Sequence, residues 1–376
     1  MDNKAILILG GYGSAGLHIA KLLLENTDVR LTLAGRSQSK AVEVSAELNT
    51  QYDGIRVAGI QVDASKEEDL KRALVGIDLL VVASSTAQYA HQVASAALAA
   101  GVDYLDIQYS TDKLRALQAI ATTIEEQERC FITDGGFHPG LPAALVRYAG
   151  EKIRNLERAV VGAVLKVDWG AYSVGDSAAE EFVSEFKNYQ PLVYRNGEWR
   201  KANMWRIRDF LRMNYGEPFG KAYAAPMMLE EMRALPEMLP SLKETGFYVA
   251  GFNWFADWFL FPMSIAAARL GPGAITRRAG RTLFWGLDRF SKPPYGIVLQ
   301  MKAGGKQGDV WRHMVIRVSH EDGYFLTAAP TVACIMQYLE GKAATPGLHF
   351  MAHIMEPEQM LRDIEKMGVK VTVEYE

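Results

Sequence analysis

Short, mostly apolar runs alternate with stretches of helical periodicity along the first part of the chain. Runs of this length without regular polar alternation are typical of strands that are buried on both faces of a parallel sheet. Strands that alternate with helices in this way predict an α/β fold, a doubly wound parallel Rossmann domain over residues 1–150. The predicted strands are residues 5–9, 29–33, 55–62, 79–83, 103–107 and 130–133.

The pattern changes after about residue 156, where strands follow one another with few helices between them. Residues 191–201 carry an Asn-Gly turn between two alternating segments, which predicts a two-residue hairpin. A second hairpin is predicted over residues 296–319. These features predict a second α+β domain with a mostly antiparallel sheet over residues 151–376. The helical pattern near residues 325–340 is expected to pack back on the first domain.

Residues 246–270 are rich in aromatic side chains and approach the length of a membrane span, but Asn253, Asp257 and Pro262 interrupt the middle. Three interpretations remain open. The segment is a buried or interface part of the second domain, a lipid-facing surface helix or lid, or a spanning helix. The second interpretation predicts a peripheral membrane contact through this segment. The side chains that would suit it are Trp254, Phe255, Trp258 and Phe259.

Composition narrows the class of protein. A chain of 376 residues is too long for one ordinary core, so two domains are expected. The net charge of −3 argues against nucleic acid as a partner. The two cysteines, Cys130 and Cys334, match no metal spacing and are expected to be reduced, and no metal site is predicted. Because the first predicted strand begins at residue 5, no signal peptide is expected, and a cytoplasmic location is predicted.

Three glycines follow the first strand in the spacing G-x-G-x-x-G. Gly11 suits a tight turn, Gly13 allows a pyrophosphate to approach the backbone, and Gly16 allows the following helix to pack closely on the strand. The N-terminus of that helix offers N–H groups to phosphates. Cofactor contacts are therefore expected from the whole turn, and the alternative is a glycine-rich turn that binds no nucleotide. The residues between the glycines are Tyr12, Ser14 and Ala15.

The end of the second strand favours NADP over NAD. An NAD site places a carboxylate about 20 residues past the glycines, whereas this chain has Arg36, Ser37 and Lys40 there. Arg36 can pair with a 2′-phosphate, Ser37 can donate a hydrogen bond to it, and Lys40 adds charge. In the alternative interpretation, Arg36 and Lys40 are solvated surface cations.

Further cofactor contacts are expected where other strands end, because open α/β sheets bind ligands at this edge. Asp63 and Ala64 follow the third strand, where an adenine contact and a helix N-cap are alternative roles for Asp63. Ala83, Ser84 and Ser85 follow the fourth strand and are expected near the pyrophosphate and the nicotinamide ribose.

Three residues are candidates for proton transfer. His138 lies in a Gly/Pro turn after the sixth strand, and histidine titrates near neutral pH. A structural hydrogen bond is the alternative role for His138. Tyr104 and Asp106 lie two residues apart on the fifth strand and therefore on one face. Asp106 would act as an acid if burial raised its pKa, and the alternative is a cap for the next helix.

With these motifs, the chain resembles the saccharopine dehydrogenase-like oxidoreductases. The resemblance rests on the glycine motif, Leu-Ala-Gly-Arg-Ser at 33–37, Gly-Val-Asp-Tyr-Leu-Asp-Ile at 101–107 and Gly-Gly-Phe-His-Pro-Gly at 135–140. It is strongest over residues 1–150 and weaker over 290–347. The turn at 136–140 differs from the Gly-Phe-Asp-Ser-Val-Pro type of many members and is nearer to lysine-dehydrogenase-like and carboxynorspermidine-dehydrogenase-like relatives.

The resemblance implies an NADP-binding domain and hydride transfer at a carbon bonded to nitrogen or its equivalent. It also implies a second domain with substrate and dimer surfaces, hence a homodimer and a small-molecule substrate, which the sequence does not identify. Two alternatives remain open. One is a reductase of a lipophilic substrate at a membrane surface, and the other is an NADP-binding sensor or scaffold without chemistry.

Overall fold

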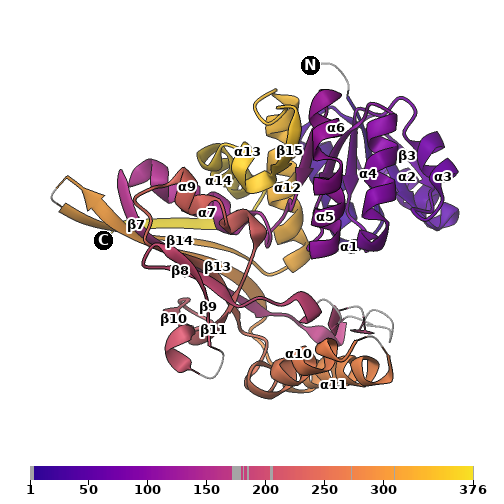
Figure 1. Cartoon of the computed structure of the whole chain (residues 1–376). Coiled ribbons are helices and arrows are strands. Elements are labelled where there is room, and N and C mark those ends of the chain that lie inside the picture. The colour runs from indigo at the N-terminus through magenta and orange to yellow at the C-terminus, as the bar shows by residue number, and fades with distance from the viewer. Residues whose placement is uncertain are drawn as a thin grey trace. The chain divides into compact units, whose positions relative to one another are not determined.

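A computed structural model describes residues 4–171, 179–180, 182–183, 186–203, 206–271, 273–308 and 310–375 of the chain (Figure 1). The chain divides into two compact units. Unit 1 comprises residues 1–144 and 324–369, and unit 2 comprises residues 145–323 and 370–376. The chain therefore leaves unit 1 after residue 144, returns at residue 324, and ends in unit 2.

Unit 1 contains a seven-stranded sheet in the order β15-β6-β5-β4-β1-β2-β3. All of its strand pairs are parallel, as expected for runs that are apolar at successive positions. The doubly wound parallel sheet predicted from the sequence is confirmed. Its strands are β1 (Ala5–Leu9), β2 (Arg30–Gly35), β3 (Val57–Gln61), β4 (Leu79–Val82), β5 (Asp103–Asp106), β6 (Cys130–Thr133) and β15 (Gly347–Phe350).

Helices connect these strands and cover the sheet (Figure 1). One buried cluster joins strand residues such as Leu80 and Phe131 to Val93 and Leu117 on two of the covering helices. The connections are α1 (Ser14–Asn26), α2 (Gln38–Gln51), α3 (Glu67–Ala73), η1 (Ala87–Tyr89), α4 (Ala90–Ala99), α5 (Thr111–Ala119), α6 (Ala121–Glu126) and α7 (Leu141–Lys152), the last of which crosses the boundary between the units.

The returning segment adds a strand to the edge of the parallel sheet. The helix α12 (Gly323–Leu339) is tied to the strands by Tyr338, whose hydroxyl donates to Asp103 at 2.6 Å. The strand β15 then pairs with β6, a seventh strand that the sequence did not predict. Two helices follow, α13 (Met351–Ile354) and α14 (Pro357–Lys366).

Unit 2 contains a sheet with the main order β10-β11-β12-β7-β13-β14-β16. It is antiparallel except for the pair β12–β7, which confirms the predicted mostly antiparallel sheet. Asn196 and Gly197 both have positive φ, as the predicted hairpin between β8 and β9 requires. The strands are β7 (Asn155–Lys166), β8 (Leu192–Arg195), β9 (Glu198–Lys201), β10 (Leu211–Asn214), β11 (Lys221–Met227), β12 (Glu244–Ala250), β13 (Gly296–Gln307), β14 (Val310–His320) and β16 (Lys370–Tyr375).

The aromatic segment 246–270 forms a strand and then helices. Its first residues belong to β12, and the remainder forms a π-helical turn, η6 (Ala256–Leu260), and α10 (Phe261–Arg269). With α11 (Ala274–Phe290), these helices enclose a separate core that contains Leu260, Leu283 and Leu287. In the part of the chain that the structure describes, no helix has both the length and the apolar composition needed to cross a membrane.

The remaining short helices of unit 2 lie in its connections. They are η2 (Trp169–Ala171), η3 (Phe186–Asn188), η4 (Ile207–Asp209), η5 (Glu230–Met232) and α9 (Leu235–Met238).

Candidate functional site

The glycine-rich turn joins β1 to α1 with almost no space around its backbone. A Cβ on Gly16 would lie 2.1 Å from the carbonyl oxygen of Gly10, and one on Gly11 would lie 2.8 Å from Leu33 Cδ2. These two positions therefore require glycine for packing. Gly13 differs, because a Cβ there would meet only the Gly10 carbonyl oxygen, at 3.1 Å. The space beside Gly13 suits the close approach of a ligand to the backbone.

Gly10 is a fourth glycine of this turn, which the sequence reasoning missed. Its φ is +91°, and a Cβ would lie 2.5 Å from the carbonyl oxygen of Ala83 at the end of β4. Its N–H donates to the carbonyl oxygen of Ala34 at 2.7 Å. Gly10 thus allows β1 to pass closely between its two neighbouring strands. The Gly-Gly pair at 10–11 in the sequence was the available signal.

The first turn of α1 is suited to an anion. Gly13 is the N-cap and has no side chain to occupy the helix end, and no acidic residue lies in the first turn. The first N–H groups of a helix, here those of Ser14, Ala15 and Gly16, have no partner within the helix. Together with the helix dipole, they form the kind of site that binds phosphate.

Tyr12 of the glycine-rich turn contacts the end of β2, next to the residues that are predicted to bind a 2′-phosphate. Its hydroxyl accepts a hydrogen bond from the backbone N–H of Ser37 at 2.8 Å. A Cβ on Gly35 would lie 2.4 Å from the same hydroxyl oxygen, so the Tyr12 ring lies directly against the strand end. Arg36 and Lys40 are exposed, and the Ser37 side chain caps α2 by accepting from the Lys40 N–H.

The residues after β3 form a tight turn. The Asp63 carboxylate accepts from the Ser65 hydroxyl at 2.7 Å and from its backbone N–H at 3.0 Å. These hydrogen bonds lower the pKa of Asp63, and the nearby positive charges of Lys66 and Arg36 add to the effect. The N-cap position of α3 is Lys66, so Asp63 does not occupy it. Ala64 is buried in the core.

The residues after β4 lie beside the glycine-rich turn. The Ala83 N–H donates to the carbonyl oxygen of Leu9 at 2.8 Å. The hydroxyls of Ser84 and Thr86 lie 3.0 Å apart, and Ser85 is exposed. The structure thus brings Ala83 and Ser84 to the edge of the sheet where Gly10 and Gly11 turn.

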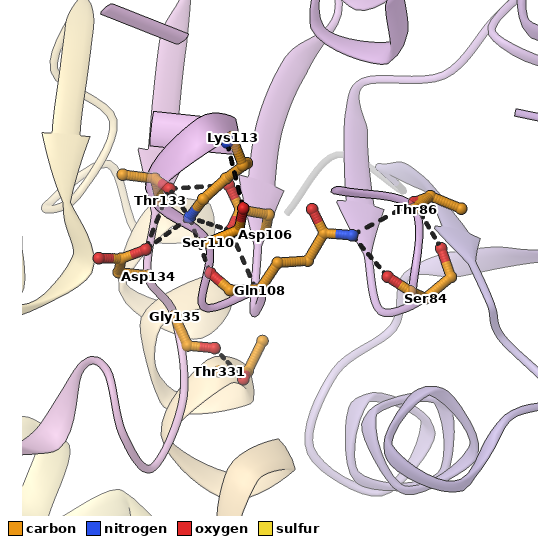
Figure 2. A network of polar contacts seen from close by, with 10 residues as sticks. All are labelled: Ser84, Thr86, Asp106, Gln108, Ser110, Lys113, Thr133, Asp134, Gly135 and Thr331. Atoms are coloured by element: carbon orange, nitrogen blue, oxygen red, sulfur yellow. Dashed lines mark hydrogen bonds and ion pairs between the residues drawn. The ribbon is translucent and has the colours of Figure 1, made fainter. Parts of the chain in front are cut away.

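A buried lysine lies at the ends of β5 and β6 and was not predicted from the sequence (Figure 2). The Lys113 side chain has no exposed surface. Its Nζ lies 2.9 Å from Asp106 Oδ1, 2.5 Å from Asp134 Oδ1 and 2.6 Å from Thr133 Oγ1. Burial lowers the pKa of Lys113, but the two carboxylates outweigh burial and hold this pKa above its ordinary value. Lys113 is therefore an ammonium ion held between two strand ends.

The two carboxylates of this network differ in their environment. Asp106 Oδ2 accepts from the Thr133 hydroxyl at 2.8 Å, and Asp106 has no exposed surface. Burial raises the pKa of Asp134, the positive charge of Lys113 lowers it, and the negative charge of Asp106 raises it again. The resulting pKa of Asp134 lies above its ordinary value. One buried ammonium thus faces two carboxyl groups.

Gln108 extends the network to the end of β4. Its side-chain Nε2 donates to the backbone carbonyl oxygen of Ser84 at 2.5 Å and to Thr86 Oγ1 at 3.2 Å (Figure 2). The backbone carbonyl oxygen of Gln108 accepts from Lys113 Nζ at 2.8 Å. Three neighbouring strand ends are consequently tied together beside the glycine-rich turn. The Lys113 side chain thus holds these strand ends in place.

The three candidates for proton transfer have different surroundings. Tyr104 is 1% exposed and stacks on Phe131, and burial followed by the Asp106 charge raises its pKa well above the ordinary value. Asp106 pairs with Lys113 as described. His138 packs edge-on against Phe137 and keeps part of its surface accessible, while burial lowers its pKa to about 4. Burial thus favours the neutral form of His138 and makes its imidazole a weaker base than that of an exposed histidine. The catalytic roles of all three stay predictions.

The fold and the glycine-rich turn define a nucleotide-binding α/β protein with a second, mostly antiparallel unit. Residues 6–129 match the family model described as the saccharopine dehydrogenase NADP binding domain. Residues 6–129 therefore resemble the NADP-binding domain of the saccharopine dehydrogenases, the chain shares their fold, and a nicotinamide cofactor is supported.

Curated relatives and a solved structure match nearly the whole chain. The carboxynorspermidine synthase of Vibrio cholerae is 23% identical over 96% of this chain and 94% of its own length. The enzyme of the same name from Vibrio alginolyticus is 22% identical over 97% and 95%. The saccharopine dehydrogenase (L-Glu forming) of Saccharomyces cerevisiae superimposes with a TM-score of 0.71 over 99% of this chain and all of its own, at 13% identity, which shows the shared fold.

Proposed function

We propose that the protein is an NADP-dependent oxidoreductase that transfers a hydride at a C–N or C–O centre of a small molecule. The observation that carries the proposal is the end of β2. An NAD site has a carboxylate at this place. This chain instead has the exposed side chains of Arg36 and Lys40, and Ser37 caps the start of α2. Only a nucleotide with a 2′-phosphate gains from two cations at this place.

Different residues along the edge of the sheet would bind different parts of such a cofactor. The first turn of α1 and the open space at Gly13 would receive the pyrophosphate. Tyr12, Arg36 and Ser37 would hold the phosphorylated ribose. The bound cofactor would supply or accept the hydride. His138 would exchange the proton with a substrate amine or alcohol, because it alone of the three candidates keeps accessible surface.

The names of the similar Vibrio enzymes, the carboxynorspermidine synthases, suggest a first compound to test as substrate. Carboxynorspermidine, which their name states, is the first substrate to test with NADP⁺ by following absorbance of the reduced cofactor. A broader panel of secondary amines and alcohols follows. Tight NADPH binding without turnover on the whole panel would contradict the enzymatic proposal and support a sensor or scaffold.

Cofactor choice is tested by fluorescence titration of the full chain with NADPH and NADH. The double variant Arg36→Gln with Lys40→Gln is expected to weaken NADPH binding on the order of tenfold to a hundredfold, because two charge-assisted contacts are lost. NADH binding should change little. The matched control is Arg115→Gln, an exposed arginine on α5, which should bind both nucleotides like the wild type. Equal affinity of the wild type for NADH and NADPH would contradict the NADP assignment.

A further inference from the structure

Unit 2 exposes a contiguous set of aromatic rings, which we call the aromatic patch: Trp254, Phe255, Phe259, Trp285 and Phe290. The ring of Phe255 lies 5.0 Å from Phe290 and 6.4 Å from Trp285, and Trp254 lies 6.2 Å from Phe259. Trp254 is 63% exposed, Phe259 55% and Trp285 54%. Five rings in mutual contact with three of them largely in water mark an interaction surface rather than scattered apolar residues.

Of the aromatic patch, Phe255 packs against the core beneath it, and the other four rings are not among the side chains of that core. The inward face of the same helices is already filled by Leu260, Leu283 and Leu287, which are at most 3% exposed. Further exposed apolar side chains belong to the same helices or their ends. They are Met263, Leu270 and Ile275, each more than half exposed.

Basic side chains accompany the aromatic patch. On α11, Arg278, Arg281, Trp285 and Arg289 follow one another at intervals of three and four residues, which places them on one face of the helix. Residues 254–292 carry six basic and two acidic side chains, a net charge of +4 in a chain whose total is −3. The surface that exposes aromatic rings is thus also the positively charged one.

These features select among possible occupants. A second copy of the same face would bring the arginine row against itself, since a two-fold interface pairs a surface with itself. Single-stranded nucleic acid would stack on the rings but would gain little from Met263, Leu270 and Ile275. An anionic lipid surface uses all three components. Tryptophan rings lie at the headgroup level, aliphatic side chains enter the acyl boundary, and arginines pair with lipid phosphates.

We propose that the face of unit 2 formed by the aromatic patch and the arginine row of α11 docks on the surface of an anionic membrane. The contact is peripheral, because the rings lie at the side of two short helices. It does not depend on the nucleotide site, so it can be tested separately from the proposed function.

The test is sedimentation of the full chain with vesicles of phosphatidylcholine, alone or mixed with phosphatidylserine. The wild type should sediment with the mixed vesicles and much less with the neutral ones, and added salt should release it. The variant Trp254→Ser with Phe259→Ser should lower binding on the order of tenfold or more. Arg278→Gln with Arg289→Gln should lower it on the order of tenfold.

The control replaces two exposed apolar side chains of unit 1, Ile55→Ser with Val75→Ser, and should bind vesicles like the wild type. Circular dichroism and NADPH binding verify that each variant is folded. Three results would overturn the proposal. They are equal binding of the ring variant and the wild type, a failure of the wild type to bind the mixed vesicles, and self-association or binding of oligonucleotides that the ring variant abolishes while vesicles are not bound.

Discussion

In unit 1 the buried ammonium of Lys113 lies between the carboxylates of Asp106 and Asp134. In unit 2, by contrast, the described hydrogen-bond partners of the Asp257 carboxyl group are the backbone N–H groups of Gly251 and Phe252. Burial accordingly raises the pKa of Asp257 to about 7. In unit 1, then, opposite charges keep a lysine ionised inside the protein. In unit 2, a carboxyl group without a cation changes its charge near neutral pH.

The surfaces of the two units differ in the same sense. Unit 1 gathers backbone N–H groups and small polar side chains at the ends of β1, β2 and β4, which suits a phosphate-bearing ligand. Unit 2 exposes the aromatic patch and the arginine row, which suit a wide, soft surface. On the two proposals made above, unit 1 is adapted to a small ligand and unit 2 to a membrane surface.

The largest effect is expected from breaking the buried network of unit 1. Lys113→Met leaves two buried carboxyl groups without a cation, which should cost about 3–5 kcal/mol of the free energy of unfolding. The measurement is urea unfolding of the full chain, read on the transition of unit 1. The control Lys71→Met removes an exposed lysine that pairs with Glu67 and Glu68, and it should change the stability far less, because solvent screens such surface pairs.

A second variant keeps this prediction testable if Lys113→Met does not fold. Adding Asp106→Asn and Asp134→Asn removes the uncompensated charges and should recover a large part of the loss. A cost below about 1 kcal/mol for Lys113→Met alone would mean that the buried network contributes little to the strand ends.

An effect with a defined sign is expected from Asp257 in unit 2. Its folded-state pKa, about 7, is raised from 3.8, so its protonated form favours folding, and that contribution is lost as the pH rises from about 4 through 7. Asp257→Asn cannot ionise, so its stability relative to the wild type should increase over the same pH range, by about 1.4 kcal/mol for each unit by which burial raises the pKa. Urea unfolding at several pH values measures this difference.

Asp288→Asn is the matched control, since this side chain is exposed on the neighbouring helix α11. Its stability should follow the wild-type dependence on pH. A constant difference between Asp257→Asn and the wild type from pH 4 to pH 8 would show that Asp257 is not a buried acid, and the contrast with Lys113 would fail.

The parallel sheet and the glycine-rich turn could be predicted because their signals are local. β1 and α1 adjoin in sequence, and the spacing of Gly11, Gly13 and Gly16 reflects contacts within one turn. The Asn-Gly hairpin was predictable for the same reason, since positive φ at Asn196 and Gly197 depends on those residues alone.

The buried lysine and the edge strand β15 could not be predicted because their partners are distant in the chain. Lys113 follows a helix N-cap and would ordinarily face solvent, and only the folded sheet brings Asp106 and Asp134 around it. β15 has four residues and becomes a strand by pairing with β6 after the chain returns from unit 2.

The three interpretations of residues 246–270 could not be distinguished from the sequence for a related reason. The sequence of Trp254, Trp258 and Phe259 is the same whether these rings are buried or exposed, and only the packing of α10 on α11 decides it.

The central claim, that unit 1 binds a nicotinamide dinucleotide at the glycine-rich turn, is tested most directly by titrating Gly13→Ala with NADPH. Gly13 has ordinary dihedral angles, φ −80° and ψ 169°, and a Cβ there would meet only one atom, so the variant should fold like the wild type. Because the methyl group would occupy the space expected for the pyrophosphate, NADPH binding should weaken on the order of tenfold or more. Thr122→Ala, an exposed change on α6, should leave binding unchanged. A folded Gly13→Ala that binds NADPH as tightly as the wild type, or a wild type that binds no nucleotide, would contradict the claim.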